Sequence, residues 1–266
     1  MLLTAKILIT FLTVVMLATV ARRLGAAAAG VLAGFPLGSA ITLYFIGAEQ
    51  GTDFAVEGAV HTIAGLLGCL ALASTYSFVA IRWPRPTMIF IPALASVVVF
   101  LVVVGGLQYL PRILWLSLLM TLTGILLTRK LLRHIPDAPV THNPASIWQK
   151  PMPAIMFRAT AATASVLGIT ALAHWLSPAQ AGLLAAFPVS FFPTLIVLQL
   201  SYGAPVVATT VRQYPEGLGA MVIYVVAVIF SYPAFGLNTG TAVALICAIL
   251  YLITYALLRR AQRRAT

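Results

Sequence analysis

The sequence is poor in charge, and the shortage is greatest for acidic residues. Charged residues make up 8% of the 266 positions, and only five of them are aspartate or glutamate. A soluble protein of this size would carry about 25% charged residues. Hydrophobic residues make up 61% of the chain. This composition excludes an ordinary soluble protein and predicts a polytopic integral membrane protein.

The common catalytic and metal-binding patterns are also missing. The only two cysteines, Cys69 and Cys247, lie in separate apolar runs and form neither a disulfide framework nor a metal site. We find no phosphate-binding glycine loop, HExxH, CxxC or Ser-His-Asp order. His134, Asp137 and His142 have no recognised metal spacing and lie among prolines, as in a loop. We therefore expect no enzyme, no cofactor and no metal site.

Long apolar runs follow one another almost without interruption. A run of about 18–23 residues crosses a hydrocarbon core of about 30 Å as a helix, and the runs lack the alternation of a membrane barrel. We expect the first run to be a retained span, because its arginines follow it. The sequence predicts an all-α bundle with nine spans, at approximately 3–21, 25–47, 62–82, 87–109, 112–128, 154–174, 178–200, 217–236 and 240–258.

The net charge of +11 is distributed by topology. If the N-terminus lies outside, only Lys6 and Arg112 fall on the outer side, which is the positive-inside bias of a bacterial inner-membrane protein. We therefore expect a cytoplasmic C-terminus and no nucleic-acid partner. The fourteen basic residues on the predicted cytoplasmic side are Arg22, Arg23, Arg82, Arg85, Arg129, Lys130, Arg133, Lys150, Arg158, Arg212, Arg259, Arg260, Arg263 and Arg264.

A proline-containing segment occurs twice. The stretch "GVLAGFPLGSAITL" (30–43) is matched 152 residues later by "GLLAAFPVSFFPTL" (182–195), with seven identities in fourteen positions. The likeness extends outward, since Gly51 aligns with Gly203 and Lys6 with Arg158. We interpret 1–109 and 154–258 as two copies of a four-helix unit, separated by an inverting helix (110–128) and a cytoplasmic loop (129–153), with a basic tail at 259–266.

An odd number of spans separates the starts of the two copies, so the second copy would be upside down relative to the first. The sequence therefore predicts an inverted-topology repeat of four, one and four helices, an architecture characteristic of secondary transporters. An ATP-binding motif is missing, so coupling would use a proton or ion gradient.

Prolines and hydroxyls mark the repeated segment as a candidate substrate site. Pro36 and Pro188 interrupt the helical hydrogen bonding of predicted spans, and Pro193 follows. Carbonyls freed at membrane depth need a neighbour, water or a ligand. The alternative is that the prolines are packing kinks and the hydroxyls bond to their own helices. The candidate polar contacts are Ser39, Thr42, Ser190 and Thr194.

Small residues recur every four positions beside these prolines. Each set would form a smooth ridge that lets another helix approach closely in lipid. The two ridges are Gly30, Gly34 and Gly38 in the first copy, and Gly182, Ala186 and Ser190 in the second.

Two groups of charged residues are further candidates. Glu49, Asp53, Glu57 and His61 are spaced by four and would share a helix face, with Glu57 and His61 the candidates for ion or proton coupling. The alternative is a solvated outer face. Lys6 and Arg158 lie a few residues inside apolar runs. They would either snorkel to the interface or attract an anionic substrate from opposite mouths.

Each half resembles a family of small, uncharacterised bacterial integral membrane proteins of roughly half this length. Members have four spans, a lysine early in the first, a short basic stretch closing it, and a glycine-rich "GG-[LI]-[LI]-A-x-x-P" opening to the second. The matching residues are Lys6, Arg22–Arg23 and "GVLAGFP" in the first half, and Arg158 and "GLLAAFP" in the second, which lacks the basic stretch. The family has no assigned substrate. The resemblance implies a half-length ancestor that assembles as an antiparallel pair, with this chain as the fused form.

Together these patterns predict a small secondary-active transporter that moves a small solute, such as an anion, by alternating access. The alternative is a membrane accessory protein that binds lipid or partner helices through its small-residue ridges.

Overall fold

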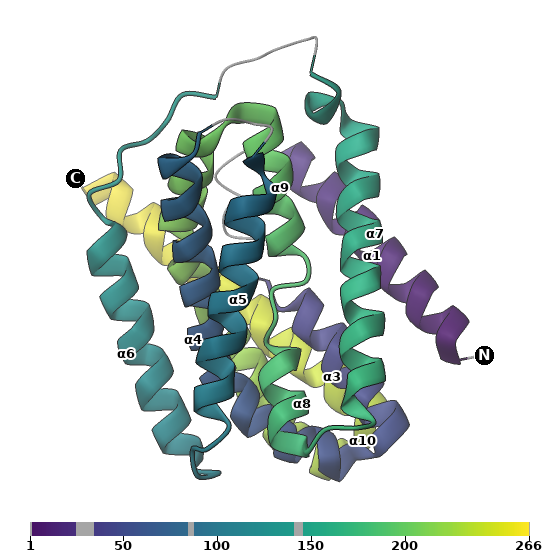
Figure 1. The fold of residues 1–266 in the computed structure, drawn as a ribbon. Helices are drawn as coiled ribbons and strands as arrows, with labels where there is room; N and C mark the ends of the chain where they lie inside the picture. Colours follow the sequence, from purple (N-terminus) through teal and green to yellow (C-terminus); the bar gives the residue numbers. More distant parts are fainter. Residues whose placement is uncertain (1, 25–34, 85–87, 141–145, 266) are drawn as a thin grey trace.

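The chain folds into helices joined by short connections. The computed structural model describes residues 2–24, 35–84, 88–140 and 146–265, and these residues contain nine α-helices and one 3-10 turn (Figure 1). The elements are α1 (Leu2–Leu24), α3 (Leu37–Gln50), α4 (Thr52–Arg82), α5 (Phe90–Leu107), α6 (Leu114–Leu132), the turn η2 (Ile147–Gln149), α7 (Pro151–Ala173), α8 (Pro178–Ala185), α9 (Phe191–Tyr202) and α10 (Ala204–Ala265). The all-α prediction is confirmed.

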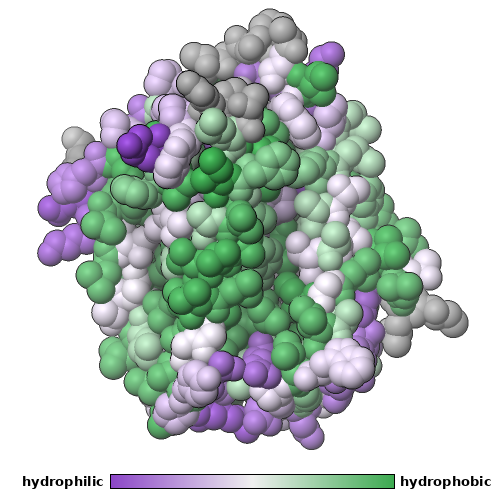
Figure 2. Space-filling view, viewed as in Figure 1, coloured by the Kyte–Doolittle hydropathy of each residue, from purple (hydrophilic) through white to green (hydrophobic). Residues whose placement is uncertain are grey.

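Several helices have the length and composition of membrane spans. Five apolar segments of the described chain are long enough to cross a bilayer: Thr52–Arg82, Phe90–Leu107, Leu114–Leu132, Pro151–Ala173 and Ala204–Leu258. Figure 2 shows a broad hydrophobic band across the middle of one face, with hydrophilic residues along the lower edge and at the upper left. The structure is therefore compatible with a membrane helix bundle, as the composition predicts.

Helix α4 lies at the centre of the bundle. It packs against α5, α8, α10 and α6, and 67% of its most apolar stretch is buried, against 11% for α6. Helix α1 packs mainly along α7, and in Figure 1 these two helices lie at the right edge of the molecule, on the side away from α6. Large apolar side chains such as Leu119 and Leu126 on α6 point outward, which suits contact with lipid chains.

Several predicted span boundaries are wrong. The span predicted at 178–200 is two helices, because α8 ends at Ala185 and α9 begins at Phe191. The spans predicted to begin at 62 and 217 belong to helices that begin at Thr52 and Ala204. Hydropathy misses these starts because the first turns carry polar residues and prolines. By contrast, the boundary predicted at 236–240 is confirmed, because the segment labelled α10 consists of two helices that meet at a kink at Gly236 (φ 72°, ψ 180°). These two helices lie against each other, since the Tyr255 hydroxyl donates to Oε2 of Glu216 at 2.9 Å.

Local backbone geometry recurs at the spacing of 152 residues. Gly51 (φ 97°) and Gly203 (φ 85°) each separate a short helix from a long one. The Gly51 amide donates to the Gly47 carbonyl at 3.1 Å, and the Gly203 amide donates to the Gln199 carbonyl at 3.0 Å. At both glycines the ψ angle is extended, a conformation essentially restricted to glycine. The same turn is therefore built twice from matching sequence positions.

We expect Gly51→Ala and Gly203→Ala to lower the free energy of unfolding by about 1–3 kcal/mol each, because a Cβ strains this backbone conformation. Steric overlap does not contribute, since an added Cβ at Gly51 meets nothing within 4 Å. Gly106→Ala in α5 is the matched control, because that site is equally open but helical. There alanine should stabilise by about 0.5–1 kcal/mol. Unfolding of the detergent-solubilised variants measures both effects. Equal free energies of unfolding for the three variants would contradict the claim that alanine strains the backbone at Gly51 and Gly203.

Candidate functional site

The two repeated prolines adopt the same local structure. The Leu37 amide donates to the Phe35 carbonyl at 2.8 Å, and the Val189 amide donates to the Phe187 carbonyl at 2.8 Å. The carbonyls of Pro36 and Pro188 then accept from the amides four residues later, at 2.7 and 2.8 Å. Pro36 is the residue before α3, and Pro188 lies in the linker between α8 and α9. These prolines therefore mark helix starts. The predicted interruption of helical hydrogen bonding is confirmed at Pro188, and the alternative of a packing kink within one continuous helix is wrong there.

The carbonyls that a kink would have freed are engaged. The Leu184 carbonyl accepts from the Phe187 amide at 2.9 Å, because the chain tightens into a final turn at the end of α8. Pro193 lies in the first turn of α9, where its missing amide proton costs nothing. The carbonyl of Leu32, four residues before Pro36, lies outside the described residues.

The two proline segments lie against each other. A Cβ built on Gly38, in the first turn of α3, would lie 2.4 Å from Cγ2 of Val189 in the α8–α9 linker. Val189 is buried in one cluster with Ile41 and Phe45 of α3. Segments 152 residues apart in the chain therefore meet at their breaks.

The hydroxyls beside the breaks are mostly engaged with their own helices. The Thr42 hydroxyl donates to the Gly38 carbonyl at 2.9 Å, and the Thr194 hydroxyl donates to the Ser190 carbonyl at 2.8 Å. Both bonds follow the packing alternative, although each hydroxyl keeps acceptor capacity. Ser39 is different, because its hydroxyl is fully buried and finds no hydrogen-bond partner among the described residues. Ser190 is half-buried.

The second small-residue ridge packs on α4. Gly182 of α8 meets Gly58 so closely that an added Cβ would lie 1.9 Å from the Gly58 carbonyl oxygen. One turn further along α4, the Thr62 hydroxyl donates to the Gly182 carbonyl at 2.8 Å. The Cys69 thiol donates to the Ala186 carbonyl, also at 2.8 Å. Cys69 is thus a buried packing residue, as expected. Of the first ridge, Gly30 and Gly34 lie outside the described residues.

A buried ion pair joins α1, α3 and α7. The Lys6 ammonium of α1 lies 2.6 Å from Oε1 of Glu49 at the end of α3, and it donates to Thr170 Oγ1 of α7 at 2.8 Å. Lys6 is only 5% exposed, and its Nζ lies 5.8 Å from the Phe45 ring centre. The snorkelling alternative does not hold for Lys6, because the ammonium turns inward to a carboxylate.

His174 connects this ion pair to the surface. Its Nε2 lies 3.4 Å from Oε2 of Glu49, and its Nδ1 contacts the Gln50 amide. The His174 side chain is 49% exposed, whereas that of Glu49 is 15% exposed. Lys6, Glu49, Thr170 and His174, which we name the Lys6 cluster, therefore form a path of polar groups from water to a buried ammonium.

The predicted acidic face is not one helix face. Glu49 lies in the last turn of α3, and the turn at Gly51 separates it from Asp53 and Glu57 on α4. Glu57 faces Arg112 at 3.7 Å, with both side chains about half exposed. His61, four residues after Glu57, is buried. The coupling role expected for Glu57 and His61 stays a prediction.

Arg158 occupies the position that matches Lys6, in different surroundings. Its Nε is buried and finds no hydrogen-bond partner among the described residues. The residue that matches Glu49 is Ser201, which has no charge. The Ser201 hydroxyl donates to the Trp148 carbonyl at 2.9 Å, and its own carbonyl accepts from the Gln149 amide at 2.8 Å. The second copy thus keeps the cation and replaces the carboxylate.

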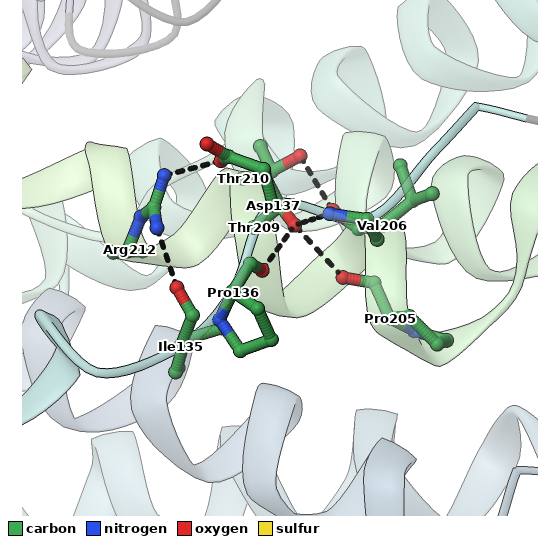
Figure 3. A network of polar contacts seen from close by, with 9 residues as sticks. Ile135, Pro136, Asp137, Pro205, Val206, Thr209, Thr210 and Arg212 are labelled. Carbon is green, nitrogen blue, oxygen red and sulfur yellow. Dashed lines mark hydrogen bonds and ion pairs between the residues drawn. The ribbon is translucent and has the colours of Figure 1, made fainter.

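The loop between α6 and α7 is anchored to α10 (Figure 3). Arg212 pairs with Asp137 and donates to the Ile135 carbonyl. The Thr209 hydroxyl accepts from the Ala138 amide at 3.0 Å. His134 is exposed, and His142 lies outside the described residues. No group of three potential metal ligands occurs in the part of the chain that the structure describes.

Comparisons with protein-family models, with curated proteins and with solved structures found no match.

Proposed function

We propose that the chain is a small secondary-active transporter of nine spans, built as an inverted-topology repeat of four, one and four helices. The observation that carries the proposal is the contact between two proline breaks with the same hydrogen bonds, 152 residues apart. Matched breaks at the interface of two halves are the typical position of a transporter binding site.

The arrangement of the matched helices supports the inverted repeat. In Figure 1, α3 lies in the lower part of the molecule and α9 in the upper part. The C-terminal ends of α4 and α6 and the N-terminal ends of α5 and α7 lie toward the upper edge. The basic residues at or next to these helix ends include Arg82, Arg129 and Lys150. By the positive-inside bias the upper edge faces the cytoplasm of a bacterial inner membrane.

In this proposal a small solute binds between the breaks at Pro36 and Pro188. Ser39 would supply a free hydroxyl, and Thr42, Ser190 and Thr194 would accept from the solute. Lys6 and Arg158 would act at the two mouths. The tight packing of these segments equally suits the alternative, an accessory protein that binds lipid or partner helices and never opens.

Side-specific labelling separates the two functions. We would replace Cys69 and Cys247 by alanine, introduce Ser39→Cys or Ser190→Cys, and treat sealed vesicles of each orientation with a membrane-impermeant maleimide, which reacts with accessible thiolates. Alternating access predicts that each cysteine is labelled from both sides, because each side opens in turn.

The matched control is Ser96→Cys on α5, a buried serine outside the proposed path that should react from neither side. If Ser39→Cys and Ser190→Cys are as inert as this control, the transporter proposal fails and the accessory role is favoured.

A further inference from the structure

We propose, building on the transporter function, that the Lys6 cluster binds one small monoanion together with one proton. The anion would take the place of Glu49 beside the Lys6 ammonium, and the proton would neutralise the Glu49 carboxylate. This assigns an anionic substrate class and locates proton coupling at Glu49.

Charge balance is the first argument. Lys6 and Glu49 form a neutral pair in a site from which water is largely excluded. A monoanion that bound to Lys6 while Glu49 stayed ionised would leave a net negative charge there, which low-dielectric surroundings strongly disfavour. When Glu49 is protonated, the charges of the Lys6 ammonium and of the bound anion again sum to zero. The site is therefore neutral when it holds both ligands or neither.

The hydrogen bonds allow this exchange. An ammonium has three donors, and the two acceptors of Lys6 are Glu49 Oε1 and Thr170 Oγ1. Thr170 also donates to the Leu167 carbonyl at 3.3 Å, so its oxygen remains fixed when Glu49 departs. An incoming anion oxygen would then replace Oε1 on an ammonium that is already oriented.

Glu49 also has an oxygen suited to receive the proton. Its Oε2 is buried and makes no hydrogen bond to the described residues, although His174 Nε2 lies 3.4 Å away. The half-exposed His174 ring can take a proton from water and pass it to Oε2. No group in this step changes oxidation state. One proton leaves the imidazolium, one carboxyl O–H forms, and water restores the histidine proton.

The other elements around Glu49 offer no competing cation among the described residues. Helix α1 contributes Lys6, and the end of α7 is followed by His174. Helix α4 carries Asp53, which is exposed, Glu57, which faces Arg112, and His61, which is buried. Helix α10 presents Tyr232 beside Gly47. Tyr44 is the further titratable residue of α3, and α8 has none. Glu49 therefore exchanges protons mainly with His174.

The second copy explains a stoichiometry of one proton. Arg158 matches Lys6, but Ser201 stands where Glu49 would be. The second mouth therefore holds a permanent cation for the anion and no carboxylate for a second proton. Each anion would cross with a single proton, and the cycle would move no net charge.

Anion binding to the purified full-length chain tests this directly. The probes are nitrate, formate and benzoate, titrated as sodium salts at constant ionic strength, with the shift in unfolding temperature as the readout. We expect at least one probe to stabilise the wild type. Because one proton binds with each anion, the apparent Kd should fall about tenfold for each pH unit of acidification over the range in which free Glu49 is ionised.

Variants identify the groups responsible. Glu49→Gln mimics the protonated carboxyl, so it should bind the same probe with a Kd independent of pH. The double variant K6M/E49Q keeps the site neutral, and the probe should no longer raise its unfolding temperature. The matched control is Asp53→Asn, which removes an exposed carboxylate. In this variant the apparent Kd should depend on pH as it does in the wild type. The proposal is overturned if no probe stabilises the wild type, or if the apparent Kd of Glu49→Gln changes with pH as in the wild type. Neither result affects labelling at Ser39 and Ser190, which tests transport separately.

Discussion

Replacing Lys6 by methionine should lower the free energy of unfolding by about 3–5 kcal/mol, because the change leaves Glu49 as a buried charge without its cation. The double variant K6M/E49Q should recover most of that loss, since no charge then remains in the site. Unfolding of the detergent-solubilised proteins, analysed as a double-mutant cycle, gives the interaction free energy of the pair.

Arg112→Met provides the comparison for an exposed pair. Arg112 and Glu57 lie 3.7 Å apart with side chains 51% and 44% exposed, so solvent screens their attraction. Such a pair contributes about 0–1 kcal/mol. If Lys6→Met costs no more than Arg112→Met, the Lys6 cluster is not the buried, charge-balanced site described here.

Gly182→Ala should destabilise the protein by about 1–3 kcal/mol or more, because the new Cβ would fall 1.9 Å from the Gly58 carbonyl oxygen. The obstacle is backbone, so α8 and α4 must separate to admit even one methyl group. Loss of the 2.8 Å hydrogen bond from Thr62 to the Gly182 carbonyl would add to the cost. Thermal unfolding of the purified variant measures the effect.

The matched control for this substitution is Gly168→Ala on α7. An added Cβ there meets nothing within 4 Å, so alanine should be neutral or slightly stabilising in the helix. Equal stability of the two variants would show that the close contact between α8 and α4 does not hold these helices together.

The sequence predicts the helical class and the positions of most helices, because both depend on local hydropathy. It does not predict the starts of α4 and α10. The first turns of α4 include Asp53 and Glu57, and those of α10 include Arg212, so a hydropathy window assigns them to loops. It also treats 178–200 as one helix, since the apolar run continues through Pro188. Pro188 itself predicts an interruption of the hydrogen bonding, but whether it ends one helix or only bends it depends on the turn that forms around it.

The repeated segment is evident from the sequence, whereas the sequence predicts the Lys6 cluster only in part. The sequence marks Lys6 as a cation inside an apolar run, but it places Glu49 on one helix face with Asp53 and Glu57, from which the turn at Gly51 separates it. The sequence does not predict the roles of Thr170 and His174, because their contacts with the Lys6–Glu49 pair depend on how α1, α3 and α7 pack. One sequence feature does point to the cluster: a chain with only five acidic residues places Glu49 at the end of an apolar stretch, where it needs a partner.

The most direct test of the central claim, that the two halves lie in opposite orientations, uses a pair of matched surface positions. Asp53 and Pro205 are separated by 152 residues, both are exposed, and each lies two residues after its positive-φ glycine. With the native cysteines replaced, Asp53→Cys and Pro205→Cys would each be treated with an impermeant maleimide in sealed vesicles. An inverted repeat predicts labelling of Asp53→Cys only from the outer side and of Pro205→Cys only from the cytoplasmic side. Labelling of both from the same side would contradict the inverted repeat and the transporter built on it.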